Sequence, residues 1–440
     1  MHIICAADEI GTIDRRVYSN NGNPNLMESK RRVVITGLGV VSAVGNNIPE
    51  FWDSLKRGRN GIRPITVFDT SSLRTHNGGE VIDLPLDVHF SSKEKKRLSR
   101  CDQFGLIAAE EALENSGLNI GEVDRERFGI ILGAGSGGIL SVERYFKALY
   151  GGEKRRPSPL LLISFSLATT TDYIAGRFDL HGPRTTAATV CSSSSAAIAF
   201  AYESILAGWA DIMFSGGSDS LCEVSYTGFN SLRLVDPEYC KPFDKRRQGL
   251  SLGEGAGIVV LEEMNHALSR GAIIAGEMLG HGICADAYHL TSPEPHGEGI
   301  ARAITMAIRN AGVDPSDVDY INAHGTGTIA NDVAETKGIK RVFGREAHAI
   351  PISSIKSMVG HCLGSAGAIE VISTLMAIKE DTIPPTLHYR VPDPLCDLNY
   401  TPNEAIQRKV DIAITNSFAF GGNNVCLVFR KWKEEGTGEQ

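Results

Sequence analysis

The stretch Thr185–Leu206, TTAATVCSSSSAAIAFAYESIL, decides the fold because a short run rich in threonine leads at once into a helix-length apolar segment. We expect a strand that ends at Val190 and a helix that begins just after Cys191. A strand followed directly by a helix is the building unit of α/β proteins with parallel sheets. The sequence therefore predicts an α/β fold with Cys191 at a strand-to-helix turn.

The position of Cys191 makes its thiol a candidate nucleophile. At a helix N-terminus the unpaired backbone N–H groups and the helix dipole favour the thiolate, which is the reactive form. The dipole contributes about 0.3 to 2 kcal/mol, so it favours the thiolate without fully ionising the thiol at neutral pH. The alternative is a small buried hydrophobe, because that is the more common state of a free cysteine.

Strand-like and helix-like segments alternate on both sides of this stretch, and the same order of elements occurs twice. Such alternation predicts βαβ units with helices covering a hydrophobic sheet, and hence two halves of one architecture. The first series comprises residues 33–41, 102–117, 128–135, 185–190 and 211–219, with a helix after Cys191. The second comprises residues 272–283, 299–312, 318–325, 331–344, 351–356 and 411–420, with a helix after Gly364.

The chain of 440 residues exceeds the usual size of one domain, roughly 100 to 200 residues. Residues 1–29 show neither helical nor strand periodicity and contain NNGNPN, which is typical of a loop. We therefore expect an N-terminal tail at residues 1–29, a first half at 30–268, a second half at 269–433 and a short tail at 434–440.

The composition excludes several classes of protein. With 44 basic and 52 acidic side chains the formal charge is −8, which argues against binding to nucleic acid or an anionic membrane. Nine cysteines without a CxxC pair predict neither a disulfide framework nor a zinc site or other metal centre. The sequence contains no uninterrupted run of about 18 apolar residues, which a membrane helix would need. We therefore expect a soluble, reduced, cytoplasmic protein.

Two motifs of the second half place histidines at the ends of strands. NAHGTGT, residues 322–328, carries His324, and SIKSMVGHCLGSAGA, residues 354–368, carries Lys356 and His361. A single histidine is more often a core or loop residue than a catalyst. In α/β sheets, however, sites assemble at the carboxyl ends of strands, so we expect these histidines near Cys191.

Two glycine-rich segments need an interpretation. NSFAFGGNN, residues 416–424, has a glycine pair suited to a flexible loop with close backbone approach, or to an ordinary hairpin turn. GAGSGG, residues 133–138, has the spacing of a dinucleotide-binding fingerprint. We reject that reading because no acidic ribose ligand follows at the expected distance.

Together, VCSSSSA, NAHGTGT, SIKSMVGHCLGSAGA and NSFAFGG resemble the motif set of elongating β-ketoacyl-acyl-carrier-protein synthases, which are members of the thiolase superfamily. The resemblance runs from about Arg32 to Lys431. It implies duplicated βαβαβ halves in a layered α-β-α-β-α arrangement and a homodimer. It also implies an acyl carrier protein as partner and no cofactor, because the phosphopantetheine arm arrives on the carrier.

The same resemblance implies catalytic roles for five residues. Cys191 would carry the acyl group, and His324 and His361 would face the malonyl thioester, where two neutral imidazoles can stabilise the enolate left by decarboxylation. Lys356 would support the electrostatics of this site. Phe420 would act as a gate and share an oxyanion hole with the backbone N–H of Cys191.

Substrate-binding roles follow from the same motifs. Thr326 and Thr328 would bind the phosphopantetheine arm through their hydroxyl groups. Leu106 would form the floor of the acyl pocket, and Phe418 and Ala419 would line it beside the gate.

Three positions depart from the family pattern. Ala419 stands where glycine is common, Gly327 where serine is frequent, and Gln248 where aspartate is usual. The methyl group of Ala419 restricts the backbone, so it affects gate motion and chain selectivity.

Docking of an acidic carrier protein would use basic residues. Arg155, Arg156 and Arg233 match the family's docking arginines, although charged runs such as Lys93–Arg100 are also typical of a solvated surface.

A thiolase would have a second catalytic cysteine in place of the histidine of NAHGT, and we interpret Cys362 as a packing residue. A non-catalytic chain-length factor would lack Cys191. A specialised or polyketide-type ketosynthase shares the same motifs and stays open as an alternative to fatty acid elongation.

Overall fold

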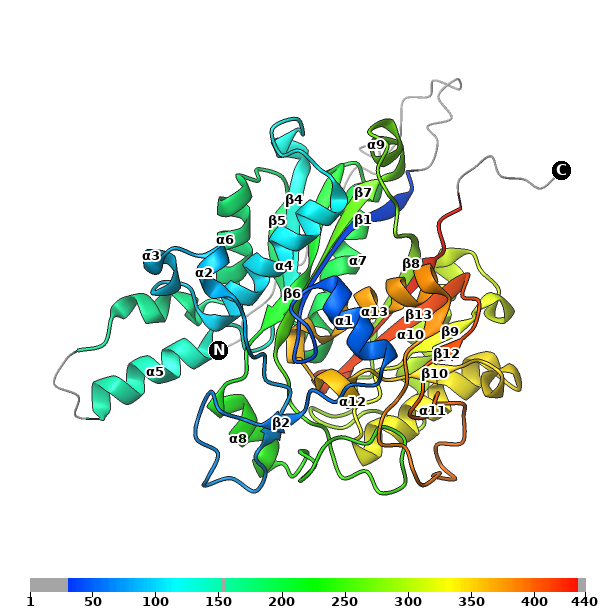
Figure 1. The fold of residues 1–440 in the computed structure, drawn as a ribbon. Helices are drawn as coiled ribbons and strands as arrows, with labels where there is room; N and C mark the ends of the chain where they lie inside the picture. Colours follow the sequence, from blue (N-terminus) through cyan, green and yellow to red (C-terminus); the bar gives the residue numbers. More distant parts are fainter. Residues whose placement is uncertain (1–30, 152–155, 434–440) are drawn as a thin grey trace, which may run out of the picture. The chain divides into compact units, whose positions relative to one another are not determined.

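Ten strands of the chain are joined by hydrogen bonds in the order β10-β9-β13-β14-β8-β1-β7-β6-β4-β5 (Figure 1). The computed structural model describes residues 31–151 and 156–433. The strands are β1 (Val33–Val41), β4 (Phe128–Gly133), β5 (Arg184–Ala187), β6 (Ile212–Asp219), β7 (Gly255–Glu263), β8 (Gly276–Ala285), β9 (Tyr320–Asn322), β10 (Ile352–Ser353), β13 (Ile412–Ala419) and β14 (Asn423–Arg430).

The strand order shows that the architecture is duplicated. Outward from the β1–β8 pair, one half reads β1-β7-β6-β4-β5 and the other reads β8-β14-β13-β9-β10. In each half these are the first, fifth, fourth, second and third of the five strands that the half contributes to the sheet. The pairings also agree, because each half has two antiparallel ladders followed by two parallel ones.

Helices fill three layers around the two halves of the sheet. The middle layer packs against strands of both halves, and most residues of its helices are buried. The middle layer consists of α7 (Ser193–Leu206) and α13 (Ala366–Glu380). The outer layers consist of α4 (Arg100–Ser116) and α6 (Thr169–Phe178) on the first half, and α10 (Glu298–Ala311) and α11 (Ile329–Phe343) on the second. This is the predicted thiolase-like α-β-α-β-α fold.

The remaining elements connect or cap these layers. They are α1 (Ile48–Lys56), β2 (Arg63–Pro64), β3 (Asn77–Gly78), α2 (Leu86–His89), α3 (Ser92–Lys95), α5 (Ile139–Tyr150), α8 (Glu223–Ser231), α9 (Met264–Ser269), α12 (Lys356–Val359), β11 (Thr382–Ile383) and β12 (Ile406–Gln407). The largest apolar cluster surrounds α7 and α13, and two further clusters lie under the outer helices.

The turn around Cys191 differs in detail from the prediction. The strand β5 ends at Ala187 rather than at Val190, and Cys191 lies in the 3₁₀ turn η4 (Val190–Ser192) rather than at the first turn of an α-helix. Val190 has φ of +58°, a left-handed conformation that strains a β-branched residue. The chain therefore reverses sharply just before the thiol, and α7 begins two residues after it.

The predicted domain boundaries stay predictions. The division at residue 268 falls within α9, between the two series of strands. The expected tails at residues 1–29 and 434–440 lie outside the described residues.

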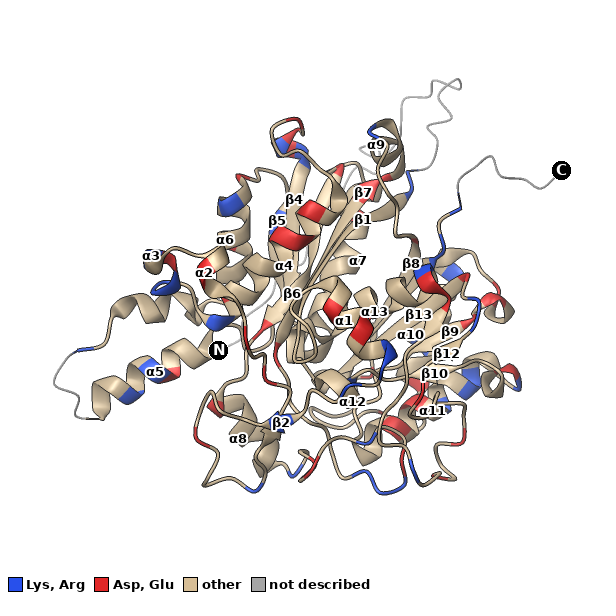
Figure 2. Cartoon of the chain, viewed as in Figure 1, with Lys and Arg blue, Asp and Glu red and all other residues tan. Residues whose placement is uncertain are grey.

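Charged side chains lie mainly at the periphery of the fold (Figure 2). In Figure 2 most of the central strands are free of Lys, Arg, Asp and Glu, and both signs of charge are mixed over the peripheral helices and loops. Within the described ranges, no helix combines the length and apolarity needed to cross a membrane. The same ranges hold no group of three or more His, Cys, Asp or Glu side chains placed to bind a metal.

Candidate active site

A cavity of about 230 Å³ lies where the ends of β5, β9 and β13 meet the turns that follow them. Residues from both halves of the chain line it, as the motifs predict. The predicted site residues that line the cavity are Cys191, Arg233, His324, Thr326, Thr328, His361, Phe418, Ala419 and Phe420.

The thiol of Cys191 is buried, with 4% of the residue exposed. Burial raises the pKa of Cys191 to about 12, and Asp219 and Glu370 act in the same direction. The Lys356 ammonium and a hydrogen bond from the backbone N–H of Phe420 favour the thiolate but do not outweigh burial. The helix dipole was expected to favour the thiolate without ionising it, and in the free enzyme desolvation of the thiol has the larger, opposite effect.

His324 and His361 lie side by side at the inner end of the cavity. Their ring centroids are 5.4 Å apart and their planes are nearly perpendicular, at 87°. Burial and the nearby Lys356 hold the pKa of each histidine well below its usual value. Both imidazoles are therefore neutral at physiological pH, as the predicted role requires.

Lys356 fixes the tautomer of His324. Its Nζ atom lies 3.3 Å from His324 Nδ1, and it forms a buried ion pair with Glu370 of α13. An ammonium group can only donate, so Nδ1 accepts and the ring proton resides on Nε2. Lys356 is not among the residues that line the cavity, and its supporting role stays a prediction.

Glu335 of α11 holds the loop that carries His324. One carboxylate oxygen accepts the N–H of His324 and the other accepts the N–H of Gly325, each at 2.8 Å. Burial raises the pKa of Glu335 to about 7, in spite of these two hydrogen bonds. The carboxylate therefore connects the first helix turns of α11 to the loop of His324.

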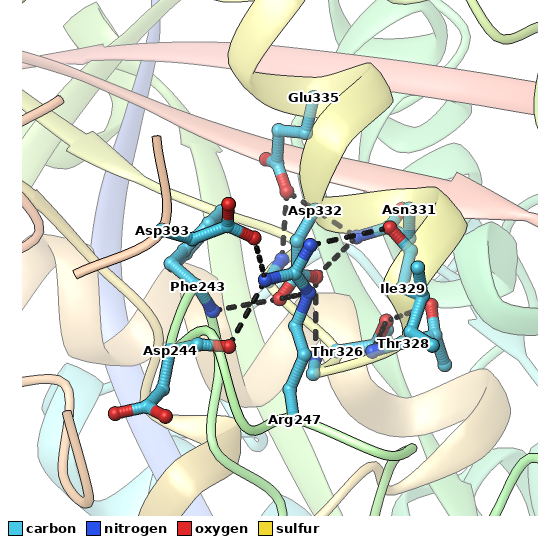
Figure 3. Close-up of polar contacts among 12 residues, drawn as sticks. Phe243, Asp244, Arg247, Thr326, Thr328, Ile329, Asn331, Asp332, Glu335 and Asp393 are labelled. Atoms are coloured by element: carbon cyan, nitrogen blue, oxygen red, sulfur yellow. Dashed lines mark hydrogen bonds and ion pairs between the residues drawn. The ribbon is translucent and has the colours of Figure 1, made fainter. Parts of the chain in front are cut away.

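A second acidic residue of α11, Asp332, binds the loop segment that contains Thr326 and Thr328 (Figure 3). Asp332 accepts the N–H of Gly327 at 3.2 Å, and the hydroxyl groups of Thr326 and Thr328 are 2.9 Å apart. Arg247 lies 3.6 Å from the Asp332 carboxylate and also binds Asp393 at 2.6 Å. This buried network fixes the loop that presents both hydroxyl groups to the cavity.

Phe420, predicted to act as a gate, lines one side of the cavity. It begins the short turn η8 (Phe420–Gly422) between β13 and β14, so the segment is both a hairpin turn and a cavity wall. Its ring stacks on Phe229 of α8 with centroids 5.6 Å apart. Ala419 has φ of −124° and ψ of 159°, an extended conformation in which its methyl group causes no backbone strain.

Other predicted residues lie elsewhere. Leu106 is buried in α4 and is not among the residues that line this cavity. Arg156 is exposed, and Arg155 lies outside the described residues. In the run at residues 93–100, Arg100 is not a surface charge, since it pairs with the buried Glu254.

Three buried acids that organise the site, Asp219, Glu335 and Glu370, were not predicted from the sequence. For Glu370 a signal existed, because it is the only charged residue in the apolar stretch AGAIEVISTLMAI. For Asp219 the signal was the rejected GAGSGG segment, whose backbone N–H groups bind this carboxylate instead of a phosphate.

Comparisons with known proteins agree with this geometry. The family model described as the β-ketoacyl synthase N-terminal domain matches residues 30–267, and the model of the C-terminal domain matches residues 275–390. The 3-oxoacyl-acyl-carrier-protein synthase 2 of Synechocystis is 42% identical over 411 residues, which cover 92% of this chain and 99% of that protein.

Solved structures are similar over the same span. One is titled the ishigamide ketosynthase/chain length factor, with a TM-score of 0.88, 35% identity, and coverage of 92% of this chain and 100% of that one. Another is a type II polyketide ketosynthase in complex with its acyl-carrier protein, with a TM-score of 0.82, 33% identity and the same coverage. The chain belongs to the β-ketoacyl synthase family.

Proposed function

We propose that the protein is a 3-oxoacyl-acyl-carrier-protein synthase of fatty acid elongation. It transfers an acyl group to Cys191 and then condenses that group with malonyl-acyl-carrier protein. The observation that carries this proposal is the single cavity lined by Cys191 and two neutral imidazoles, His324 and His361.

In the first step the Cys191 sulfur attacks the thioester carbonyl of the acyl carrier. The thiol proton passes to the departing carrier sulfur, so the carrier leaves as a free thiol. Negative charge grows on the carbonyl oxygen, where the backbone N–H groups of Cys191 and Phe420 form the oxyanion hole. In the free enzyme the Phe420 N–H points at the Cys191 sulfur, which is a short distance from that position.

In the second step malonyl thioester loses carbon dioxide and becomes an enolate. His324 Nε2–H and the His361 imidazole donate to the enolate oxygen as its charge develops. The enolate carbon attacks the acyl carbonyl on Cys191, and the Cys191 thiolate leaves and regains a proton. Each preorganised donor of this kind contributes about 2.7 to 4 kcal/mol, or 10² to 10³ in rate.

The substrate arrives on an acyl carrier protein. Thr326 and Thr328 lie at the cavity wall, where their hydroxyl groups bind the phosphopantetheine arm. Exposed Arg233 also lines the cavity, and together with Arg155 and Arg156 it is proposed to dock the acidic carrier. The similar ketosynthase structure in complex with its carrier supports this partner. The cycle needs no cofactor beyond the arm of the carrier.

The active form is proposed to be a homodimer in the cytoplasm. The strand β5 ends the sheet order, and Arg184 and Thr185 in it are exposed. An exposed edge strand next to the nucleophile turn is suited to pairing with a second copy. Sedimentation velocity at assay concentrations tests this, and a monomer with full activity would contradict it.

A polyketide-type ketosynthase is the second candidate. It is favoured by the similarity to the ishigamide ketosynthase/chain length factor structure. The acyl chain profile separates the two candidates, since an elongation enzyme accepts saturated acyl carriers over a series of lengths.

The proposal is tested by intact-mass spectrometry after incubation with acyl-carrier proteins of several chain lengths. We expect one acyl group per chain, located by peptide mapping to Cys191. Cys362→Ala serves as a matched control, because Cys362 is also buried and adjoins His361. This variant is expected to keep the acyl label on Cys191. Label on another residue, or none with any chain length, contradicts the proposal.

A further inference from the structure

The carboxylate of Asp219 joins the two catalytic turns. Asp219 is the last residue of β6 and is fully buried. Its Oδ1 atom accepts the N–H groups of Ser136 and Gly137 at 2.8 and 2.5 Å. Its Oδ2 atom accepts those of Gly135 and Gly364 at 2.8 and 2.6 Å. One carboxylate oxygen is thus shared by a loop of the first half and a loop of the second.

The loop of the first half supports the nucleophile. The Ser193 hydroxyl group donates to the carbonyl oxygens of Ala134 and Val190, at 3.1 and 2.7 Å. Ser193 therefore connects the loop that contains Gly135 to the turn that contains Cys191. A shift of this loop moves the thiol with it.

The loop of the second half carries a catalytic histidine. Gly364 follows His361 by three residues, in the turn η7 (Leu363–Ser365). A Cβ atom on Gly364 would lie 2.4 Å from the nitrogen of Gly135, so the two backbones are in direct contact. Their N–H groups point at the same oxygen, and without an anion these buried donors would be left unpaired.

The charge of Asp219 does not activate the thiol. Its negative charge raises the pKa of Cys191, which disfavours the thiolate. Burial raises the pKa of Asp219 itself to about 6, so it is ionised at neutral pH and acts as an acceptor. Its contribution to the reaction is therefore geometric.

We propose that Asp219 is a positioning residue for condensation, which sets the spacing between Cys191 and His361 by binding backbone N–H groups of both loops. This inference rests on the proposed function. Acyl transfer needs the thiol, and decarboxylation needs the histidines. Carbon–carbon bond formation needs both at a fixed separation, and a displacement of about 1 Å in such a site costs up to about 10²-fold in rate.

The test measures three rates in Asp219→Asn: acylation of Cys191, release of carbon dioxide and formation of 3-oxoacyl product. The amide keeps the size of the side chain but turns an NH₂ group toward the N–H donors. We expect acylation and decarboxylation to persist while condensation falls about 10- to 100-fold. The ratio of carbon dioxide to product then rises from one to about 10 to 100.

Asp319→Asn is the matched control. Asp319 also accepts backbone N–H groups, those of Asp411 and Ile412 at 2.8 and 3.0 Å, but it precedes β9 at the end of that strand away from His324. We expect this variant to keep a ratio of one. If Asp219→Asn folds poorly, Asp219→Glu keeps the charge, displaces the oxygens and is expected to give the same uncoupling.

A ratio of one in both Asp219 variants, or equal uncoupling in Asp319→Asn, overturns the positioning role. Failure of the proposed function looks different, because the wild-type protein would then neither acylate Cys191 nor release carbon dioxide.

Discussion

The two halves of the molecule contain equivalent turns that do different work. In the first half η4 leads into α7, and in the second half η7 leads into α13. Each turn starts with a non-glycine residue in the left-handed region, Val190 with φ of +58° and Leu363 with φ of +51°. The next residue is Cys191 in the first turn and Gly364 in the second.

This difference shows how a duplicated scaffold divides a reaction. The first turn presents a side chain to the cavity, and that side chain is the proposed nucleophile. The second turn presents only backbone, which allows it to press against Gly135 and share Asp219. The second half instead supplies His324 and His361, which lie near its turn, and it supplies no proposed nucleophile.

The largest expected effect is a loss of malonyl decarboxylation, proposed for the second half, without loss of acyl transfer to Cys191 in the first half. In His324→Ala, one donor to the enolate oxygen is lost, so decarboxylation of malonyl-acyl-carrier protein should fall about 10²- to 10³-fold. Acylation of Cys191 should stay within a few-fold of wild type, because its oxyanion hole is made of backbone N–H groups. Carbon dioxide release and intact mass measure the two steps. Equal loss of both would show that the halves do not act separately.

The second prediction concerns the structural difference between the turns. In Gly364→Ala the added methyl meets backbone atoms of Ala134 and Gly135, which have no flexible end to yield. The free energy of unfolding should fall by about 1 to 3 kcal/mol, as overpacking of a close contact usually costs. Urea unfolding measures the change. Gly176→Ala is the control, since nothing lies within 4 Å of its Cβ and it should not be destabilised.

The third prediction contrasts the pH dependence of the halves. The pKa of Cys191 is raised to about 12. Below that pH, each increase of one pH unit raises the thiolate fraction of Cys191 about tenfold. Alkylation of Cys191 by iodoacetamide should therefore accelerate about tenfold per pH unit between about pH 7 and 9. A plateau in this range would indicate an already ionised thiol.

Decarboxylation should behave differently over neutral pH. The pKa values of His324 and His361 are held well below their usual range, so neither ring gains or loses charge between about pH 6 and 8. We expect a flat profile for carbon dioxide release from malonyl-acyl-carrier protein, measured in the absence of an acyl donor.

The smallest expected effect tests the gate. Ala419 is extended, so replacement by glycine removes no strain and adds conformational freedom to the unfolded chain. Ala419→Gly should lower the free energy of unfolding by about 0.5 to 1 kcal/mol. Thermal unfolding measures this loss, and the acyl chain profile shows whether a freer gate admits longer chains. A stabilised variant would show that the methyl group strains the closed gate.

The residues proposed as catalytic could be predicted from sequence because each lies in a short motif at the end of a strand. Cys191, His324 and His361 were found in this way, and the cavity brings them together. The repeated order of segments likewise predicted the duplicated fold. These features depend on local pattern, which a single sequence records directly.

The remaining features depend on contacts between distant segments. The pKa of Cys191 was expected to fall, but burial by both halves raises it. Asp219, Glu335 and Glu370 look like ordinary acids until the fold brings backbone N–H groups or Lys356 to them. Leu106 was assigned to the acyl pocket by resemblance, and that assignment stays a prediction.

The division of the reaction between the halves is tested most directly by carbon dioxide release from Cys191→Ala. Supplied with malonyl-acyl-carrier protein alone, this variant cannot carry an acyl group but keeps Lys356 and both histidines. We predict that it releases carbon dioxide at a rate within a few-fold of wild type and forms no 3-oxoacyl product. Loss of carbon dioxide release in a folded Cys191→Ala variant would contradict the account, because decarboxylation would then require the thiol.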